Sequence, residues 1–219
     1  MKKLLSYDLF LFDFDGLLVN TEDLHMHAYQ EMLRRRGYTL DWNFKTYATH
    51  AHASTEILSR AVYDALPGLE KEESDWMKLR EEKQALYTDA INNGEISLMP
   101  GVIELFDYLE GKSMAVVTNS PKKQVDIICD MLSSLKSISL WVTREEYKRA
   151  KPAPDGYLRA MTMAGTTNAV GFEDTEKGLQ SLHAAKVEPV LIRPPTYPKV
   201  AKCVNTFESL LDLIAYQRK

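Results

Sequence analysis

The sequence predicts an α/β protein with a Rossmann-like, doubly wound parallel sheet and an inserted α-helical unit. Short apolar runs alternate along the chain with segments of helical spacing, and this alternation is interrupted once, between about residues 21 and 93. Alternation of strand and helix is typical of parallel sheets, whose ligand sites lie beyond the carboxyl ends of the strands. We therefore expect functional residues directly after the apolar runs.

The composition is typical of a soluble globular protein. Of the 219 residues, 45% are hydrophobic and 26% are charged, and 27 basic against 31 acidic residues leave a formal net charge of −4. These values exclude disordered and collagen-like classes. Because the chain carries no net positive charge that would attract nucleic acid or an anionic membrane, we expect neither as a partner. A small-molecule substrate is favoured.

The apolar runs are the expected strands. Each is nearly continuous in apolar residues, as strands that are covered on both faces of a parallel sheet are. In chain order they are residues 7–14, 114–117, 138–142, 169–172 and 190–192. Apolar residues at helical spacing separate or follow them and predict core helices. These helical patterns cover residues 125–132, 157–164, 179–182 and 207–214.

The long segment between the first two expected strands is helical in pattern. It lacks strong strand candidates, and residues such as Leu79 and Leu86 recur at helical spacing. We expect a core domain of residues 1–19 and 95–219 and an inserted helical cap domain of residues 20–94. The insert leaves the sheet after the first strand and returns before the second, which places it above the carboxyl edge of the sheet. We therefore expect it to act as a lid over the site.

Cysteine usage and the first residues suggest a cytoplasmic protein. Cys129 and Cys203 lie far apart and form no C-x-x-C pair, which suits a reducing compartment. Leu4 and Leu5 follow two lysines like the start of a signal peptide, but Asp8 interrupts the apolar run. We expect a cytoplasmic monomer or weak homodimer.

Two aspartates follow the first expected strand. Asp13 and Asp15 flank a phenylalanine, and the two-residue alternation of an extended chain sends both carboxylates to one side. Neighbouring carboxylates repel unless a cation neutralises them or they divide nucleophilic and acid–base roles. The structural alternative is a polar strand end at which Gly16 supplies the bend.

A hydroxyl-rich segment follows the second expected strand. Ser120 as N-cap and Pro121 as first helical residue predict a helix start. Helix N-termini attract anions, and the Thr118 hydroxyl with nearby backbone N–H groups is suited to phosphate oxygens. A helix cap that binds no ligand is an equally good interpretation of this segment alone.

Charged residues mark the last two segments. Lys151 precedes a stiff turn with two prolines, and Asp155 is expected to cap the next helix. A fixed lysine neutralises phosphate, although most lysines are solvated surface groups. Glu173 and Asp174 end the fourth expected strand, so they should join Asp13 and Asp15 at one edge of the sheet. Such a cluster suits Mg²⁺, whereas the pair alone could merely cap the following helix.

Taken in order, these segments resemble the four motifs of the haloacid dehalogenase superfamily, in particular its β-phosphoglucomutase-like phosphatase branch with a helical cap. The resemblance extends over nearly the whole chain. The matching segments are residues 13–22, 117–120, 151–155 and 171–175. The resemblance implies a phosphoric monoester hydrolase that uses Mg²⁺ as its cofactor and acts on a small phosphorylated metabolite.

The resemblance also implies catalytic roles. Asp13 would be the nucleophile that becomes an aspartyl-phosphate, and Asp15 would be the general acid and then the general base. Thr118 and Lys151 would hold the phosphate. Dehalogenases resemble this pattern but lack an acid at the position of Asp15, which favours phosphoryl transfer over carbon–halogen cleavage.

Binding roles are carried over from the family in the same way. The implied Mg²⁺ ligands are Asp13, Asp174 and the backbone carbonyl of Asp15, with Glu173 as a further ligand or a neighbour of the ligands. The expected substrate-binding residues in the core are Gly16, Asn119 and Ser120.

The cap departs from the mutase pattern. His25 matches a histidine that assists substrate binding or proton control in the mutase branch. Mutase-like relatives carry an arginine for the second phosphate where this chain has residues 49–54, and the next arginine is Arg60. We therefore expect hydrolysis of a singly phosphorylated substrate, with His50 and His52 as specificity contacts.

Other interpretations stay open. One is a hexose-phosphate mutase of the same fold, and another is a catalytically silent binding or regulatory protein, against which the four intact motifs argue. The cap histidines could also form a transition-metal site, although His25 and His27 do not share a helix face. Lys186 stands where the family usually has glycine, so a local difference is expected there. The turn at residues 194–198 is expected to connect the last core elements.

Overall fold

The computed structural model describes residues 2–200 and 205–219, so Cys203 lies outside the described residues. The chain forms two compact units. The first consists of Met1–Asn20, Ser97–Pro195 and Val200–Lys219, and the second of Thr21–Ile96 and Thr196–Lys199. None of the helices in the described chain has both the length and the apolar character that a membrane crossing requires.

The first unit contains a six-stranded parallel sheet with the strand order β3-β2-β1-β4-β5-β6. This arrangement confirms the doubly wound α/β fold. The strands are β1 Leu9–Phe12, β2 Ser113–Val117, β3 Leu140–Val142, β4 Ala169–Glu173, β5 Glu188–Ile192 and β6 Asn205–Phe207. Only β6 falls outside the expected runs, because its residues Asn-Thr-Phe are partly or fully exposed and contain no apolar stretch.

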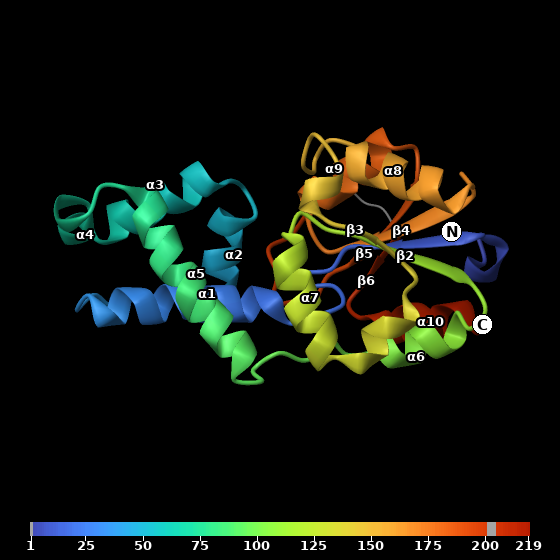
Figure 1. The fold of residues 1–219 in the computed structure, drawn as a ribbon, viewed down its shortest axis with the longest axis horizontal. Helices are drawn as coiled ribbons and strands as arrows, with labels where there is room; N and C mark the ends of the chain where they lie inside the picture. The colour runs from blue at the N-terminus through green and yellow to red at the C-terminus, as the bar shows by residue number, and fades with distance from the viewer. Residues whose placement is uncertain (1, 201–204) are drawn as a thin grey trace. The chain divides into compact units, whose positions relative to one another are not determined.

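Helices cover both faces of this sheet. They are α6 Val102–Tyr108, α7 Lys122–Met131, α8 Asp155–Ala164, α9 Glu176–Ala184 and α10 Leu210–Gln217, with 3-10 turns η1 Leu4–Ser6, η2 Ser133–Ser137 and η3 Arg144–Glu146. Helices α8 and α9 lie on one face of the sheet, and α6 and α10 lie on the other (Figure 1). The strands are therefore apolar on both sides.

The central strand β1 shows this double burial. All four of its residues are buried, and it pairs in parallel with β2 on one side and β4 on the other. Leu9 and Leu11 belong to the core formed with α8 and α9, whereas Phe12 contacts Phe106 of α6 with ring centroids 6.1 Å apart. The alternation of side chains along the strand thus divides β1 between the two faces.

Two helix starts differ from the expectation. The Ser120 side chain does not cap α7, and the first N–H of that helix, on Lys122, donates to the Glu145 carboxylate at 3.0 Å. Asp155 is the first residue of α8 instead of its cap, and its carboxylate pairs with Arg149 at 2.7 Å. In both cases a charged partner outside the helix, 23 residues away for Lys122 and six residues away for Asp155, binds the group that the local pattern alone assigns to a cap.

The second unit is a helical bundle with its own core. Its helices are α1 Thr21–Arg35, α2 Phe44–Ala51, α3 Thr55–Ala65, α4 Pro67–Glu72 and α5 Trp76–Asn92. Helices α1 and α5 make the most extensive contact in this unit, and Leu33 and Leu79 are completely buried in its core. Asp75 caps the start of α5 by accepting the Met77 N–H at 2.9 Å.

The turn after β5 does more than connect core elements. Thr196–Lys199 groups with the helical unit, and Tyr197 is buried there. Its ring centroid lies 4.8 Å from that of Phe44 in α2. The segment lies between β5 and β6, as expected for a connection of the last core elements, and its aromatic packing adds a contact with α2 that the sequence did not indicate.

Candidate active site

The polar residues of three motifs meet at one edge of the sheet. Asp13 follows β1, Thr118 follows β2 and Asp174 follows β4, which are adjacent parallel strands. The carboxyl ends of parallel strands lie at the same edge, so residues more than 50 positions apart in sequence converge. The Asp13 N–H donates to the Phe172 carbonyl at 3.0 Å and thereby aligns the ends of β1 and β4.

Lys151 lies between two carboxylates. Its ammonium nitrogen is 2.6 Å from Asp13 Oδ1 and 2.6 Å from Glu173 Oε1. Burial alone would lower the pKa of Lys151, but the negative charges of Asp13 and Glu173 raise that pKa well above its usual value. Asp13 is largely buried, but its side chain keeps 12% of its surface exposed, whereas the Glu173 side chain is completely buried.

Glu173 is enclosed by protein. Its Oε1 also accepts a short hydrogen bond from the Tyr157 hydroxyl, and the Lys151 ammonium lies 5.0 Å from the centre of the Tyr157 ring. Its Oε2 is buried and has no hydrogen-bond partner among the described residues. Burial, and secondarily the charge of Asp13, raises the pKa of Glu173 above its usual value.

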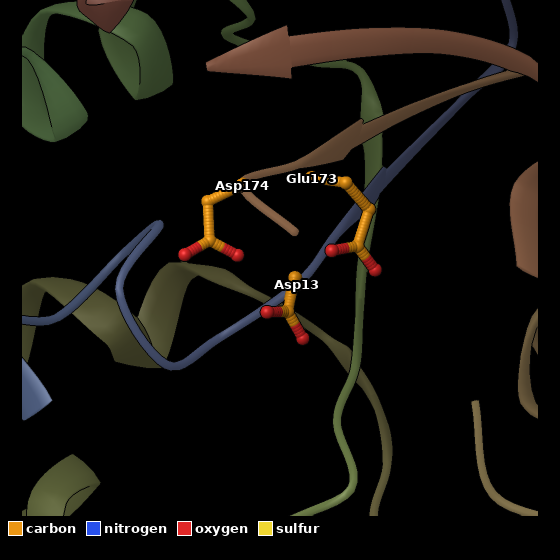
Figure 2. Close-up of side chains that lie close together, drawn as sticks. All are labelled: Asp13, Glu173 and Asp174. Carbon is orange, nitrogen blue, oxygen red and sulfur yellow. The ribbon is translucent and has the colours of Figure 1, made fainter. Parts of the chain in front are cut away.

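The acidic cluster fits a divalent cation. Asp13, Glu173 and Asp174 each offer an oxygen, and these oxygens lie within 4.8 Å of one another. Figure 2 shows the three carboxyl groups gathered around one space at the strand ends. Three converging carboxylates repel one another unless positive charge offsets theirs, and an all-oxygen donor set suits a hard ion. The residues present could therefore hold a metal ion.

Asp15 is oriented differently from Asp13. Its Oδ2 accepts hydrogen bonds from the Ser120 hydroxyl at 2.6 Å and the Thr118 hydroxyl at 3.1 Å. Gly16 takes a positive φ of 77°, so the chain bends immediately after Asp15. The side chain of Asp15 is thus held by the loop after β2, and it is not one of the carboxylates that cluster with Asp174.

The three cap histidines expected at the substrate lie in the helical unit with partners of their own. His25 Nδ1 is 2.6 Å from the Lys83 ammonium, and the His25 ring stacks on Tyr87 with centroids 4.0 Å apart. His52 Nε2 lies 3.1 Å from Glu22, whereas His50 packs against a tryptophan ring. In the described part of the chain, these histidines form no cluster of metal-ligating atoms.

Several residues that shape these sites were missed by sequence reasoning. Tyr157 and Tyr147 contact motif residues through their hydroxyl groups, and Arg193 donates a short hydrogen bond to the Asp174 carbonyl. Lys83 is buried between the rings of two tyrosines. Of these residues, only Arg193 follows an apolar run directly, namely the fifth. Its position in the sequence could therefore have placed it at this edge of the sheet.

The fold and this edge define a class. A doubly wound parallel sheet that presents a partly exposed aspartate, a buried lysine and further carboxylates at its carboxyl edge has the parts of a hydrolytic enzyme. The chain belongs to the haloacid dehalogenase-like hydrolase family, whose sequence model matches residues 10–192. This membership confirms the resemblance drawn from the four motifs, and the protein is a hydrolase.

Individual relatives agree with this family. The chain is 29% identical over 196 residues to the protein CbbY of Rhodobacter capsulatus, with 86% of each chain covered. It is 25% identical over 186 residues to a phosphorylated carbohydrates phosphatase of Thermotoga maritima, with 81% of each covered. Its fold is similar to the crystal structure of CbbY from Rhodobacter sphaeroides, at a TM-score of 0.72 and 21% identity, over 94% of this chain and 96% of that one.

Proposed function

We propose that this protein is a Mg²⁺-dependent phosphatase that hydrolyses a small phosphorylated metabolite through an aspartyl-phosphate. The observation that carries the proposal is the Lys151 ammonium, 2.6 Å from the partly exposed Asp13 carboxylate and 2.6 Å from the buried Glu173 carboxylate, with Asp174 in the same acidic cluster. This combination places a nucleophile next to charge that can neutralise phosphate. Relatives named for phosphorylated carbohydrates, glycerol 3-phosphate and fructose 1-phosphate support the substrate class.

The proposed reaction has two displacements. An Asp13 oxygen attacks phosphorus while the bond to the leaving oxygen breaks, and Asp15 gives its proton to that oxygen. A water molecule then attacks the phosphorus of the aspartyl-phosphate and passes a proton to Asp15, which frees Asp13 and inorganic phosphate. The hydrogen bonds from Ser120 and Thr118 hold Asp15 in one orientation for both proton transfers.

The metal part of the proposal rests on the acidic cluster. Asp13, Asp174 and the backbone carbonyl of Asp15 would hold Mg²⁺, with Glu173 as a further ligand or as the anchor of Lys151. When bound, the ion supplies positive charge that offsets the charge on the phosphoryl oxygens. Thr118 and Lys151 would contact the same oxygens from the protein side.

The role of the helical unit is also a proposal. On the resemblance to capped relatives, residues 20–94 would form a cap whose closure excludes bulk water. His25, His50 and His52 would then set discrimination among leaving groups. Replacing His25 or His52 by alanine is expected to change the ranking of substrates more than the basal hydrolysis of an activated aryl phosphate, and an unchanged ranking in both variants contradicts this role.

The test of the reaction is a phosphate-release screen of the purified protein with and without Mg²⁺. The panel contains sugar phosphates including fructose 1-phosphate, glycerol 3-phosphate, phosphoglycolate, nucleotides and pyrophosphate. We expect Mg²⁺-dependent release from at least one phosphomonoester, and we expect Asp13→Asn to abolish it while the circular dichroism spectrum stays unchanged. Asp8→Asn, an exposed aspartate at the other end of β1, is the matched control and keeps full activity.

The same screen separates the alternatives. Release that survives in Asp13→Asn refutes the assigned nucleophile. A hexose-phosphate mutase would move phosphate between positions on one sugar, activated by a bisphosphate, without net release. A catalytically silent binding protein would bind a member of the panel and turn over none.

A further inference from the structure

The Asn119 side chain connects two loops at the site. Its Oδ1 accepts the backbone N–H of Lys151 at 3.1 Å and lies 2.7 Å from the Tyr147 hydroxyl, whose single proton it shares with the Thr118 carbonyl. These partners lie 32 and 28 residues further along the chain. An amide oxygen has two lone pairs, and both donors approach this one, so the oxygen of Asn119 is committed to protein partners although the residue itself is exposed.

Tyr147 strengthens this connection. Its hydroxyl lies 2.6 Å from the Thr118 carbonyl as well as 2.7 Å from Asn119 Oδ1, so it bridges two consecutive residues of the loop after β2. Burial raises the pKa of Tyr147 to about 12, which keeps the phenol protonated as a donor. The Arg144 guanidinium covers its ring at 5.3 Å and donates to its backbone carbonyl at 2.9 Å.

The connected loops carry the groups that would hold phosphate. Thr118 immediately precedes Asn119, and Lys151 presents its ammonium to Asp13 from the backbone position that Asn119 binds. A shift of about 1 Å in a charged group next to a reacting phosphate can cost about 100-fold in rate. The distance between the Thr118 hydroxyl and the Lys151 ammonium therefore depends on this hydrogen-bonded bridge.

We propose that Asn119 and Tyr147 are positioning residues, which set the Lys151 turn against the Thr118 loop. This inference rests on the proposed phosphatase function. In it, the side-chain oxygen of Asn119 binds the Lys151 turn, and the other atoms of Asn119 would make the expected contact with the substrate. Asn119 acts through Lys151, so its loss affects every substrate alike. A residue that reads the leaving group affects substrates unequally.

The first test measures kcat and KM of Asn119→Ala and Tyr147→Phe on para-nitrophenyl phosphate and on the best metabolite from the screen. We expect kcat/KM to fall by about 10- to 100-fold in Asn119→Ala and by the same factor on both substrates. Tyr147→Phe keeps the ring and loses one donor, so its loss is smaller. Asn168→Ala, an exposed asparagine before β4, is the matched control and keeps wild-type kinetics.

A second test examines the bridge without turnover. In nitrogen–proton correlation spectra, the Lys151 amide proton should shift upfield in Asn119→Ala and should not shift upfield in Asn119→Asp, which retains an acceptor oxygen. In a Lys151→Ala background, adding Asn119→Ala should cause no further loss of residual activity. Unequal effects on the two substrates, an unmoved Lys151 amide or a fully additive loss would each overturn the inference.

The two tests also separate this inference from the proposed function. If the wild-type protein releases phosphate from no substrate, the phosphatase proposal fails, and the spectra still show whether Asn119 binds the Lys151 turn. If release is observed and the Lys151 amide does not respond to Asn119→Ala, the function stands and the positioning role is refuted.

Discussion

Glu173 shows how a completely buried carboxylate is kept at the site. One oxygen receives the Lys151 ammonium and the Tyr157 hydroxyl, and the other lies against Gly178 of α9. A Cβ atom at position 178 would come within 1.8 Å of Glu173 Oε2. A side chain as small as that of alanine therefore cannot fit unless the carboxylate moves, so the glycine provides the space that the charge cluster needs.

Gly178→Ala is expected to displace Glu173 from Lys151. Overpacking of this kind costs about 1–3 kcal/mol of unfolding free energy, although alanine favours the helix. We expect lower stability in urea denaturation together with at least about a 10-fold loss of kcat, because Lys151 loses one of its two carboxylate partners. Gln180→Ala, an exposed position on the same helix, is the control for helix propensity and leaves both quantities near wild type. Wild-type kinetics in Gly178→Ala would show that the position of Glu173 does not matter.

At the level of elements, α9 ends in an unusual way. Lys186 adopts a positive φ of 60°, the left-handed conformation that glycine takes most readily, and it is the only described residue besides glycines to do so. The Lys186 N–H donates to the His183 carbonyl at 3.0 Å, and the next N–H, on Val187, donates to Leu182 at 3.0 Å. The helix end thus takes the left-handed backbone geometry that glycine adopts most easily, and the side chain of lysine carries a conformational cost there.

Lys186→Gly is expected to stabilise the protein. A non-glycine residue in the left-handed region costs about 1 kcal/mol, so the midpoint of urea denaturation should rise while the m-value stays unchanged. Lys186→Ala removes the charge without removing the strain, and it should match the wild type. Phosphate release by Lys186→Gly should remain at the wild-type level. A lower midpoint for glycine than for alanine would contradict the assigned strain.

At the level of the whole molecule, the two units differ in what they bury. The sheet unit buries its charges at the strand ends, whereas the helical unit buries Lys83 beside His25 and pairs Glu22 with His52. Burial, and then the charge of Lys83, lowers the pKa of His25 to about 3. Although burial opposes the shift, the hydrogen bond from His52 and nearby positive charges lower the pKa of Glu22 to about 2.

These shifts predict a loss of stability in acid. An unfolded histidine has a pKa of about 6.5, so between pH 6.5 and 3 the unfolded state binds a proton on His25 that the folded state does not, and the unfolding free energy falls as the pH falls. From pH 7 to 5 this linkage amounts to ~2 kcal/mol. Below about pH 4.5 the unfolded state also binds a proton on Glu22, which adds to the loss.

Urea denaturation of wild type and His25→Gln at pH 7 and pH 5 checks this prediction. The wild type should lose more unfolding free energy than the variant over this interval, because glutamine does not titrate. His27→Gln, an exposed histidine on the same helix, is the matched control for removing an imidazole from α1. Equal losses in wild type and His25→Gln would show that His25 does not bind the extra proton.

Much of the architecture followed from local patterns. Apolar runs marked every strand except β6, and the parallel connection implied by strand–helix alternation brought Asp13, Thr118 and Asp174 to one edge. This inference works because burial on both faces leaves a continuous apolar signature and because the carboxyl ends of parallel strands coincide. The residue types at those ends then predicted the family.

The partners of individual side chains depended on the folded chain. Ser120 looked like a helix cap, but its hydroxyl binds Asp15, and the start of α7 is satisfied by a glutamate 23 residues away in sequence. The bonds of Asn119 to Lys151 and of Tyr157 to Glu173 likewise join separate motifs. The periodicity of a sequence indicates that a side chain is buried or that a helix begins. It does not indicate the bonding partner, because several donors and acceptors of the same kind lie within reach of each group. Only the packing of helices and loops on the sheet decides which of them lies close enough to bond.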